Sequence, residues 1–397
     1  MGATAATAES RVEVAAIPLS AFTGAGPDTQ ALDAGIRRMC RSQAMPGRVR
    51  VTFEREPEFS LGCRAAGDDC QILVARAEPA VRARSAGSFG QVVGVACRSV
   101  RRLFVNGIEQ QLGYLSQLRV DPEFQGRWLV SRGFRALRAL HDADPLPAYL
   151  TAIVEGNREA TGVLLENRRK GFPVFRSVAE LRTLAISVSI SKAAAPRGGS
   201  ISAARDAEMS EIAEFLQREG GRRQFFPART ADSLRALAPF GLRMEHFLVP
   251  RRASGEIAGV IALWDQSSYK QTVVQGYSGW LRAAAPLLNW SAPWTGRSFL
   301  PRPGDKLQSA YAAFICIAND DLQVFGALLA ETLNAARRRS LTHLLLGMDA
   351  RDPLLPVAQN FGHISYPSRL YLAEWPEGGT FHEQLDDRPV YADIATL

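Results

Sequence analysis

The chain has 397 residues, of which 46% are hydrophobic and 22% are charged. This composition is ordinary for a globular protein and excludes disorder as the main state. Because single cores stop growing near ~250 residues, the length predicts two domains. The formal net charge of +7 is dispersed, and basic runs such as Arg168–Lys170 are short, so the charge does not favour a nucleic-acid partner.

Cysteine and histidine usage gives no metal-ligand pattern. The chain has five cysteines, Cys40, Cys63, Cys70, Cys97 and Cys316, without a C-x-x-C pair. The N-terminal stretch lacks the regions of a signal peptide, and no segment reaches the ~18 apolar residues of a membrane span. We therefore expect reduced thiols, no metal, no membrane span and a cytoplasmic location.

The first recognisable elements are a strand pair and a strand-loop-helix unit. CQILVARAE (70–78) and GQVVGVACR (90–98) predict a hairpin. In the segment 113–140, GYLSQLRV alternates as a strand does, and Asp121-Pro122 ends it. A short loop follows, and then apolar residues recur on one face of a helix from Val130 to His141.

The loop of this unit can bind phosphate. Free backbone N–H groups gather at a helix N-terminus, where the helix dipole favours an anion. Arg127, Arg132 and Arg135 add guanidinium groups that suit phosphate oxygens. From these residues alone, the loop is either a pyrophosphate site or a structural turn between strand and helix.

The remaining elements divide the chain in two. AYLTAIVEGN (148–157) and LRTLAISVSI (181–190) predict strands, and SKAAAPRGGS (191–200) predicts a linker. A helix within 201–220 then opens a second domain, and FLVPR (247–251) with GEIAGVIAL (255–263) predicts a hairpin. The expected domains are residues 1–190 and 201–397, joined by 191–200.

The two hairpins resemble each other. Gly90, Val92, Gly94 and Val95 align with Gly255, Ile257, Gly259 and Val260. This self-similarity favours duplication of one domain, and the alternative is two unrelated α/β domains.

A polar and aromatic run in the second half, WDQSSYKQTVVQGYSGW (264–280), suits an acceptor pocket or the cleft between the domains. The alternative is a solvated hairpin whose aromatic rings pack on the face of the domain.

Two motifs resemble a known family. A strand, Asp-Pro, and then Phe124–Arg127 before an amphipathic helix is similar to the cofactor motif Q/R-x-x-G-x-G/A of the GCN5-related N-acetyltransferases, with Gln125 in the first position. Asn157, Ala160 and Leu164 resemble the N-x-x-A helix of that family, and Gly171-Phe172 resembles its closing pair. The order of elements matches the family over roughly residues 12–189.

The resemblance implies an α+β fold of two tandem acyl-CoA N-acyltransferase-like domains. Each would be a mixed, mostly antiparallel sheet flanked by helices, and the second would be degenerate because it lacks the motif. The sheet would part between its fourth and fifth strands to admit acyl-CoA. The implied cofactor-binding residues are Leu118, Arg119, Val120, Gln125, Gly126, Arg127, Trp128, Leu129, Val130 and Asn157.

Direct attack of an amine on a thioester needs a base and an acid. Glu155, at the end of the fifth strand, and Tyr114, on the fourth, are the candidate catalytic residues. The alternatives are that Glu155 caps the helix starting near Asn157, and that Tyr114 is a core or cleft-wall residue.

The expected function is therefore an N-acyltransferase that uses acyl-CoA, with acetyl-CoA as the expected donor and a small-molecule or peptide amine as acceptor; a homodimer is left open. The alternative is an inactive acyl-CoA or ligand-binding sensor or assembly module on the same fold. Trp128 and Val130, which stand where the family has small residues, favour this alternative. The order of elements and the arginine-rich loop favour transfer.

Overall fold

The computed structural model describes residues 12–23, 26–45, 47, 49–67, 69–77, 90–125, 128–165, 171–189, 201–295 and 300–397. Below, the first half means the described residues up to 189, and the second half means those from 201. The predicted linker, 191–200, lies outside the described residues.

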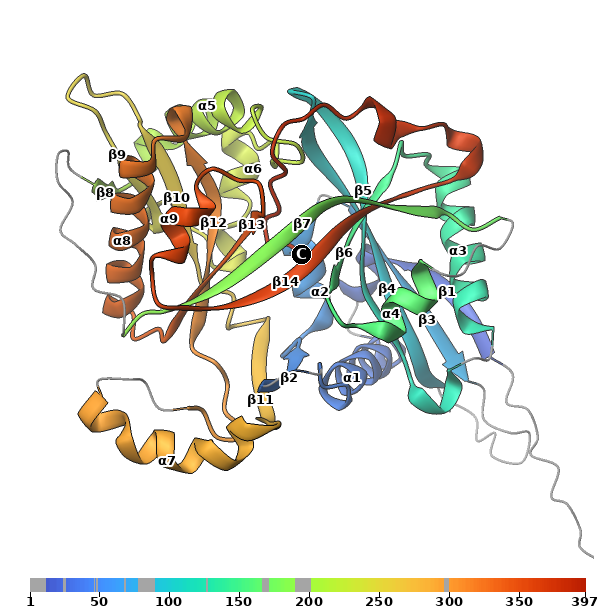
Figure 1. Cartoon of the computed structure of the whole chain (residues 1–397). Helices are drawn as coiled ribbons and strands as arrows, with labels where there is room; N and C mark the ends of the chain where they lie inside the picture. Colours follow the sequence, from blue (N-terminus) through green and yellow to red (C-terminus); the bar gives the residue numbers. More distant parts are fainter. Residues whose placement is uncertain are drawn as a thin grey trace, which may run out of the picture.

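The described strands fall into a large sheet and a small one. Their bounds are β1 Val12–Pro18, β2 Val49–Glu54, β3 Asp69–Ala77, β4 Gln91–Val105, β5 Ile108–Val120, β6 Tyr149–Val154, β7 Val174–Ser187, β8 Ile201–Ala203, β9 Phe247–Pro250, β10 Gly259–Trp264, β11 Gln271–Tyr277, β12 Ser309–Ile317, β13 His343–Asp349 and β14 His363–Glu374. Twelve of them form one sheet in the order β1-β3-β4-β5-β6-β14-β7-β13-β12-β10-β9-β8 (Figure 1). Within it, β5–β6 and β12–β13 are the parallel pairs of the described strands, and the other pairs are antiparallel.

Helices cover this sheet. The α-helices among the described residues are α1 Pro27–Ser42, α2 Phe59–Ala66, α3 Leu129–Ala143, α4 Arg158–Leu164, α5 Met209–Gly220, α6 Ala231–Arg235, α7 Trp280–Thr295, α8 Leu322–Arg338 and α9 Leu355–Gln359. In the first half, successive residues of β3 face opposite sides. Ile72 packs with the core under α1 and α2, and Leu73 packs with the core under α3. The first half is therefore a sheet between two helical layers.

The two halves exchange strands. β14 of the second half lies between β6 and β7 of the first, and β7 pairs along its C-terminal part with β13 of the second. The long β7–β14 pair crosses the centre of the molecule in Figure 1. A second link is the separate antiparallel pair of β2 and β11, one strand from each half. Each half therefore completes its sheet with a strand from the other.

The predicted duplication is visible in the sheet. The predicted hairpins are confirmed as β3–β4 and β9–β10, with Gly255 at positive φ of 90° in the second turn. The antiparallel register also slips at aligned places, between Val95 and Cys97 in β4 and between Val260 and Ala262 in β10. The run 264–280 is not a hairpin, because β11 pairs with β2 of the first half.

Candidate functional site

The fourth and fifth strands of the first half part as predicted. β5 and β6 are joined by only two bridges among the described residues, Gly113 with Tyr149 and Tyr114 with Leu150. A Cβ on Gly113 would lie 2.0 Å from a ring carbon of Tyr149, so the strands approach this closely only because residue 113 is glycine. Beyond this vertex, β5 continues to Val120 and β6 to Val154. The unbridged strand edges there can pair with an extended ligand.

A β-bulge lies just inside this opening. Gln117 has a φ of 57°, in the left-handed region that costs a non-glycine residue about 1 to 3 kcal/mol. The register with β4 slips at the same place. Leu118, which follows, is 45% exposed although it is a large apolar residue on a strand. The bulge therefore alters the direction of the strand edge where the opening begins.

The loop after β5 leads into α3. The Asp121 carboxylate accepts a hydrogen bond from the Glu123 amide at 3.0 Å and holds a short 3-10 turn. Gln125 is exposed, and Gly126 and Arg127 lie outside the described residues. Trp128 precedes the helix at a φ of 60°, makes no side-chain cap bond and is 65% exposed.

The start of α3 is anchored by apolar packing. Leu129 is buried in a core cluster with Phe124 and Val93, and Val130 is partly buried. The side chain of Leu129 therefore serves the core, which leaves backbone groups for any ligand at this end of the helix.

The other predicted residues lie at separate points of the opening. Arg119 is half-buried, and within the described part of the chain its Nε makes no hydrogen bond. Glu155 is exposed at the far end of β6, and its amide donates to the Pro367 carbonyl at 3.0 Å. Asn157 caps α4 by accepting the Ala160 amide at 3.1 Å, so the helix cap is Asn157 itself.

Tyr114 lies at the vertex and is buried. The Arg101 guanidinium stacks on its ring, with the guanidinium carbon 3.8 Å from the ring centroid. Burial raises the pKa of Tyr114 to about 12, although the Arg101 charge opposes this shift. The phenol is therefore protonated at neutral pH, which is the form an acid requires.

A cavity adjoins the bulge and draws on both halves. It contains about 490 Å³ of space, open solvent included, and is lined by Ser116 and Gln117 of β5, by residues of α2 with Arg55, and by Gln266, Tyr269, Lys270 and segment 395–397 of the second half. The run 264–280 therefore does line a cleft between the halves, which was one of the two sequence interpretations. Ser99 Oγ, Gln266 Oε1 and the Tyr269 hydroxyl in this cavity are buried without a partner in the described structure. Buried polar atoms of this kind indicate a polar ligand or water.

Lys270, which is half-buried, also lines this cavity. Its Nζ donates to the main-chain oxygens of Ala395 at 3.1 Å and Leu397 at 3.4 Å, and it lies 4.7 Å from the ring centroid of Tyr311. Burial, together with the positive charge of Arg55, lowers the pKa of Lys270 well below its ordinary value. A lowered amine pKa suits a proton acceptor, a role that the sequence did not indicate for this lysine.

The second half has its own parting strands, and the C-terminal tail of the chain enters the gap between them. β12 and β13 are bridged from Ser309 with His343 to Tyr311 with Leu345 and then diverge. Between them, the Ile315 amide donates to the Tyr391 hydroxyl at 3.1 Å. A Cβ on Gly347 would lie 2.2 Å from a side-chain carbon of Ile394. The tail of the chain therefore occupies part of the second opening.

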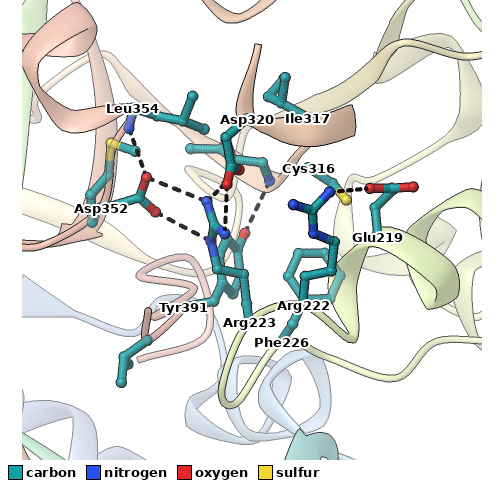
Figure 2. A pocket seen from close by; sticks show the side chains of 14 residues that line it. Glu219, Arg222, Arg223, Phe226, Cys316, Ile317, Asp320, Asp352, Leu354 and Tyr391 are labelled. Atoms are coloured by element: carbon teal, nitrogen blue, oxygen red, sulfur yellow. Dashed lines mark hydrogen bonds and ion pairs between the residues drawn. The ribbon is translucent and has the colours of Figure 1, made fainter. Parts of the chain in front are cut away.

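A partly buried ion pair lines a pocket that remains beside the tail. Figure 2 shows Arg223 pointing between Asp320 and Asp352, with which it pairs at 2.6 Å and 3.5 Å. Asp352 also accepts the Leu354 amide at 2.9 Å. The same pocket is lined by Ile315–Ile317 of β12 and by Gly347 and Met348 of β13, and it contains about 460 Å³ of space, open solvent included.

The chain contains two copies of a mixed sheet in which two neighbouring parallel strands part, β5 and β6 in the first half and β12 and β13 in the second. This is the tandem fold of acyl-CoA N-acyltransferases related to GCN5, as the sequence resemblance predicted. No protein-family profile and no curated protein sequence matches the chain.

Solved structures share this fold. Saccharomyces cerevisiae N-myristoyltransferase with bound myristoyl-CoA matches with a TM-score of 0.62 and 10% identity, over 96% of this chain and 89% of that one. A GCN5-related glucosamine N-acetyltransferase region of a fungal multi-domain GH3 beta-N-acetylglucosaminidase matches with a TM-score of 0.59 and 14% identity, over 93% of this chain and 39% of that one. A probable N-acyltransferase from Enterococcus faecalis matches with a TM-score of 0.51 and 8% identity, over 94% and 74% of the two chains.

Within the described part of the chain, none of the helices combines the length and the apolar character that crossing a membrane requires.

Proposed function

We propose that the protein is an acyl-CoA-dependent N-acyltransferase that uses the opening of its first half. The observation that carries the proposal is the parting of β5 and β6 beyond Tyr114 and Leu150, directly beside a cavity built by both halves. Acyl-CoA would lie between the strands, with its acyl carbonyl near the Gln117 bulge. The amine acceptor would reach that carbonyl from the cavity.

The proposed cofactor contacts follow the strand and the loop. The backbone of Leu118 to Val120 would pair with the pantetheine arm, and the amides of Gln125 to Val130 would hold the pyrophosphate at the start of α3. The solvent exposure of Trp128 supports this proposal, because a bulky ring at that position does not need to fill the loop. Asn157 would lie near the acyl end of the cofactor.

The proposed reaction is direct transfer. The acceptor nitrogen attacks the thioester carbon, the new C–N bond forms, the C–S bond breaks, and the coenzyme A thiolate leaves. A base must take one proton from the amine, and the thiolate must gain one. Lys270 suits the base because burial favours its neutral form, and the oxygens of Ala395 and Leu397 are in place to receive the resulting ammonium.

Tyr114 and Glu155 keep the roles proposed from the sequence. Tyr114 would supply the proton to the thiolate, since its raised pKa keeps the phenol protonated. Glu155 is the alternative base, and its exposed place at the wide end of the opening suits an acceptor that enters from that side.

Titration calorimetry with acetyl-CoA and longer acyl-CoAs, followed by free-thiol release with a panel of amines, tests the proposal. Binding with thiol release supports transfer. Binding without release for every amine supports the sensor alternative, and no binding overturns both. Arg127→Glu should abolish binding if the loop holds pyrophosphate, whereas Arg252→Glu, at an exposed position in the second half, should leave affinity within about three-fold because it is not part of the proposed cofactor loop.

A further inference from the structure

Three of the five cysteines meet in the first half. Cys63 of α2, Cys70 of β3 and Cys97 of β4 are buried, and their Sγ atoms all lie within 4.8 Å of one another. The Sγ atoms of Cys63 and Cys97 are 3.8 Å apart. These residues line the cavity beside Ser116 and Gln117. Among the described residues, these cysteines form the one group of three or more potential metal ligands whose ligand atoms lie close together.

The strand register explains the convergence. Cys70 lies opposite Ser99 on β4, and Cys97 is two residues before Ser99, so the three side chains share one face of the sheet. Cys97 is in turn opposite Ser116 on β5, on the face that meets the cavity. α2 packs on this face and brings Cys63 to the same point.

The spacing of the sulfur atoms suits a single metal ion. Zn²⁺ binds cysteine sulfur at ~2.3 Å in tetrahedral geometry, which places two ligand sulfurs about 3.8 Å apart. The Cys63–Cys97 separation of 3.8 Å therefore needs no rearrangement to accommodate the ion. Three thiolates are soft ligands that select zinc and similar ions over magnesium or calcium.

The charges around the cluster favour thiolates. Arg101, a buried cation near Cys70, provides positive charge beside the cluster. Arg55, buried beside the same cavity, adds further positive charge against the net negative charge of a three-thiolate zinc centre.

A polar group without a partner also faces the cluster region. Ser99 is only 2% exposed, and its Oγ makes no hydrogen bond in the described structure. It lies opposite Cys70 and lines the same cavity. A metal-bound water would give this hydroxyl the partner that it lacks.

We propose that Cys63, Cys70 and Cys97 bind one Zn²⁺ ion whose fourth position opens into the cavity between the halves. Three protein ligands with an open position characterise zinc centres that bind a water or a substrate group, whereas purely structural centres have four protein ligands. The site would place a cation in the wall of the cavity. The inference stands on the cysteine geometry and does not depend on acyl transfer.

Metal content measures the proposal directly. Full-length protein purified under reducing conditions, supplied with Zn²⁺ and desalted, should hold one zinc per chain by plasma mass spectrometry. Cys63→Ser, Cys70→Ser and Cys97→Ser should each weaken zinc affinity at least ten-fold. Cys40→Ser and Cys316→Ser remove buried cysteines outside the cluster, so they should keep full stoichiometry.

A cobalt titration of the unmodified protein avoids dependence on the variants. Co²⁺ should give thiolate-to-metal absorption that saturates at one equivalent and is lost on adding Zn²⁺. No cobalt absorption and no retained zinc in protein with five titratable thiols would overturn the proposal. A Cys63–Cys97 disulfide found by mass spectrometry in protein that takes no metal after reduction would likewise overturn it, and would assign the pair to redox chemistry instead.

Discussion

Gln117 and Phe314 occupy the same position in the two halves of the molecule. Each is the third residue after the last parallel bridge of its strand, Tyr114 on β5 and Tyr311 on β12. Each also has a left-handed backbone, with φ values of 57° and 52°. The duplicated fold has thus kept the same strained bulge twice, although the chain's own tail enters the second opening.

The bulge predicts different results for two substitutions at residue 117. Gln117→Gly should keep catalytic efficiency within about three-fold, because glycine adopts positive φ without strain and the backbone is the proposed contact. Gln117→Val should lower the free energy of unfolding by about 1 to 3 kcal/mol and weaken acyl-CoA binding, because a β-branched residue disfavours this conformation. Urea unfolding and calorimetry measure the two effects. Equal loss of binding in both variants would show that the glutamine side chain is the contact.

Local elements of this fold could be predicted from the sequence. The strand GYLSQLRV and its stop at Asp121-Pro122 were predictable because side-chain alternation and proline act within a few residues. The helix cap near residue 157 was predicted too, but assigned to Glu155 as the alternative to a catalytic role. Asn157 makes it, because it directly precedes the first helical residue, Arg158, and its side chain accepts the Ala160 amide.

Non-local pairing could not be predicted in the same way. The insertion of β14 between β6 and β7 depends on tertiary packing between segments far apart in the chain, and no residue in either strand specifies it. The same holds for Lys270, whose environment combines segments of both halves, and for Cys63 and Cys97, whose sequence spacing resembles no metal motif. Spacing along the chain reveals only metal motifs made of neighbouring residues, whereas these cysteines meet only in the folded structure.

Loss of the ion pair beside the second opening should lower stability. Arg223→Ala should lower the free energy of unfolding by about 3 kcal/mol, because it leaves the buried carboxylate of Asp352 and the partly buried carboxylate of Asp320 without their cation. Arg222→Ala is the matched control. Arg222 is its exposed neighbour and pairs with Glu219 at 3.3 Å, so its loss should cost less than about 1 kcal/mol in urea unfolding. Similar values for the two variants would contradict the burial argument.

If Lys270 is the base, kcat of the proposed acyl transfer should depend on pH. Lys270→Met should lower kcat by at least about 100-fold with acyl-CoA affinity unchanged, because only proton transfer is lost. In the unmodified protein, kcat should rise with pH as Lys270 loses its proton, with a midpoint below the ordinary lysine value. That rise should be absent from the variant. Lys306→Met, at an exposed position, is the control, and an unchanged pH profile in Lys270→Met would exclude this lysine as the base.

The same lysine affects stability in a defined direction. Because its folded-state pKa is lowered, the folded protein binds fewer protons than the unfolded chain between that pKa and the ordinary value. Stability should therefore rise as pH rises through this window. Lys270→Met lacks the titration, so its unfolding free energy should depend less on pH there. A variant with the same dependence as the unmodified protein would show that the amine is not desolvated.

Because of Asp393, the stability of the folded protein should fall, rather than rise, as pH increases in the acid range. Burial raises the pKa of its carboxyl to about 6, against the charges of Arg101 and Lys270, so the folded state holds a proton that the unfolded chain releases above about 4. The stabilisation is complete below the unfolded pKa and is lost as pH rises through 6, an effect of about 3 kcal/mol. Asp393→Asn cannot titrate. Between pH 4 and pH 7, the unmodified protein should therefore lose about 3 kcal/mol relative to this variant in urea unfolding. Asp232→Asn, at an exposed position, is the control and should show the same pH dependence of stability as the unmodified protein. If Asp393→Asn also showed that same pH dependence, the buried carboxyl would be ionised over the whole range.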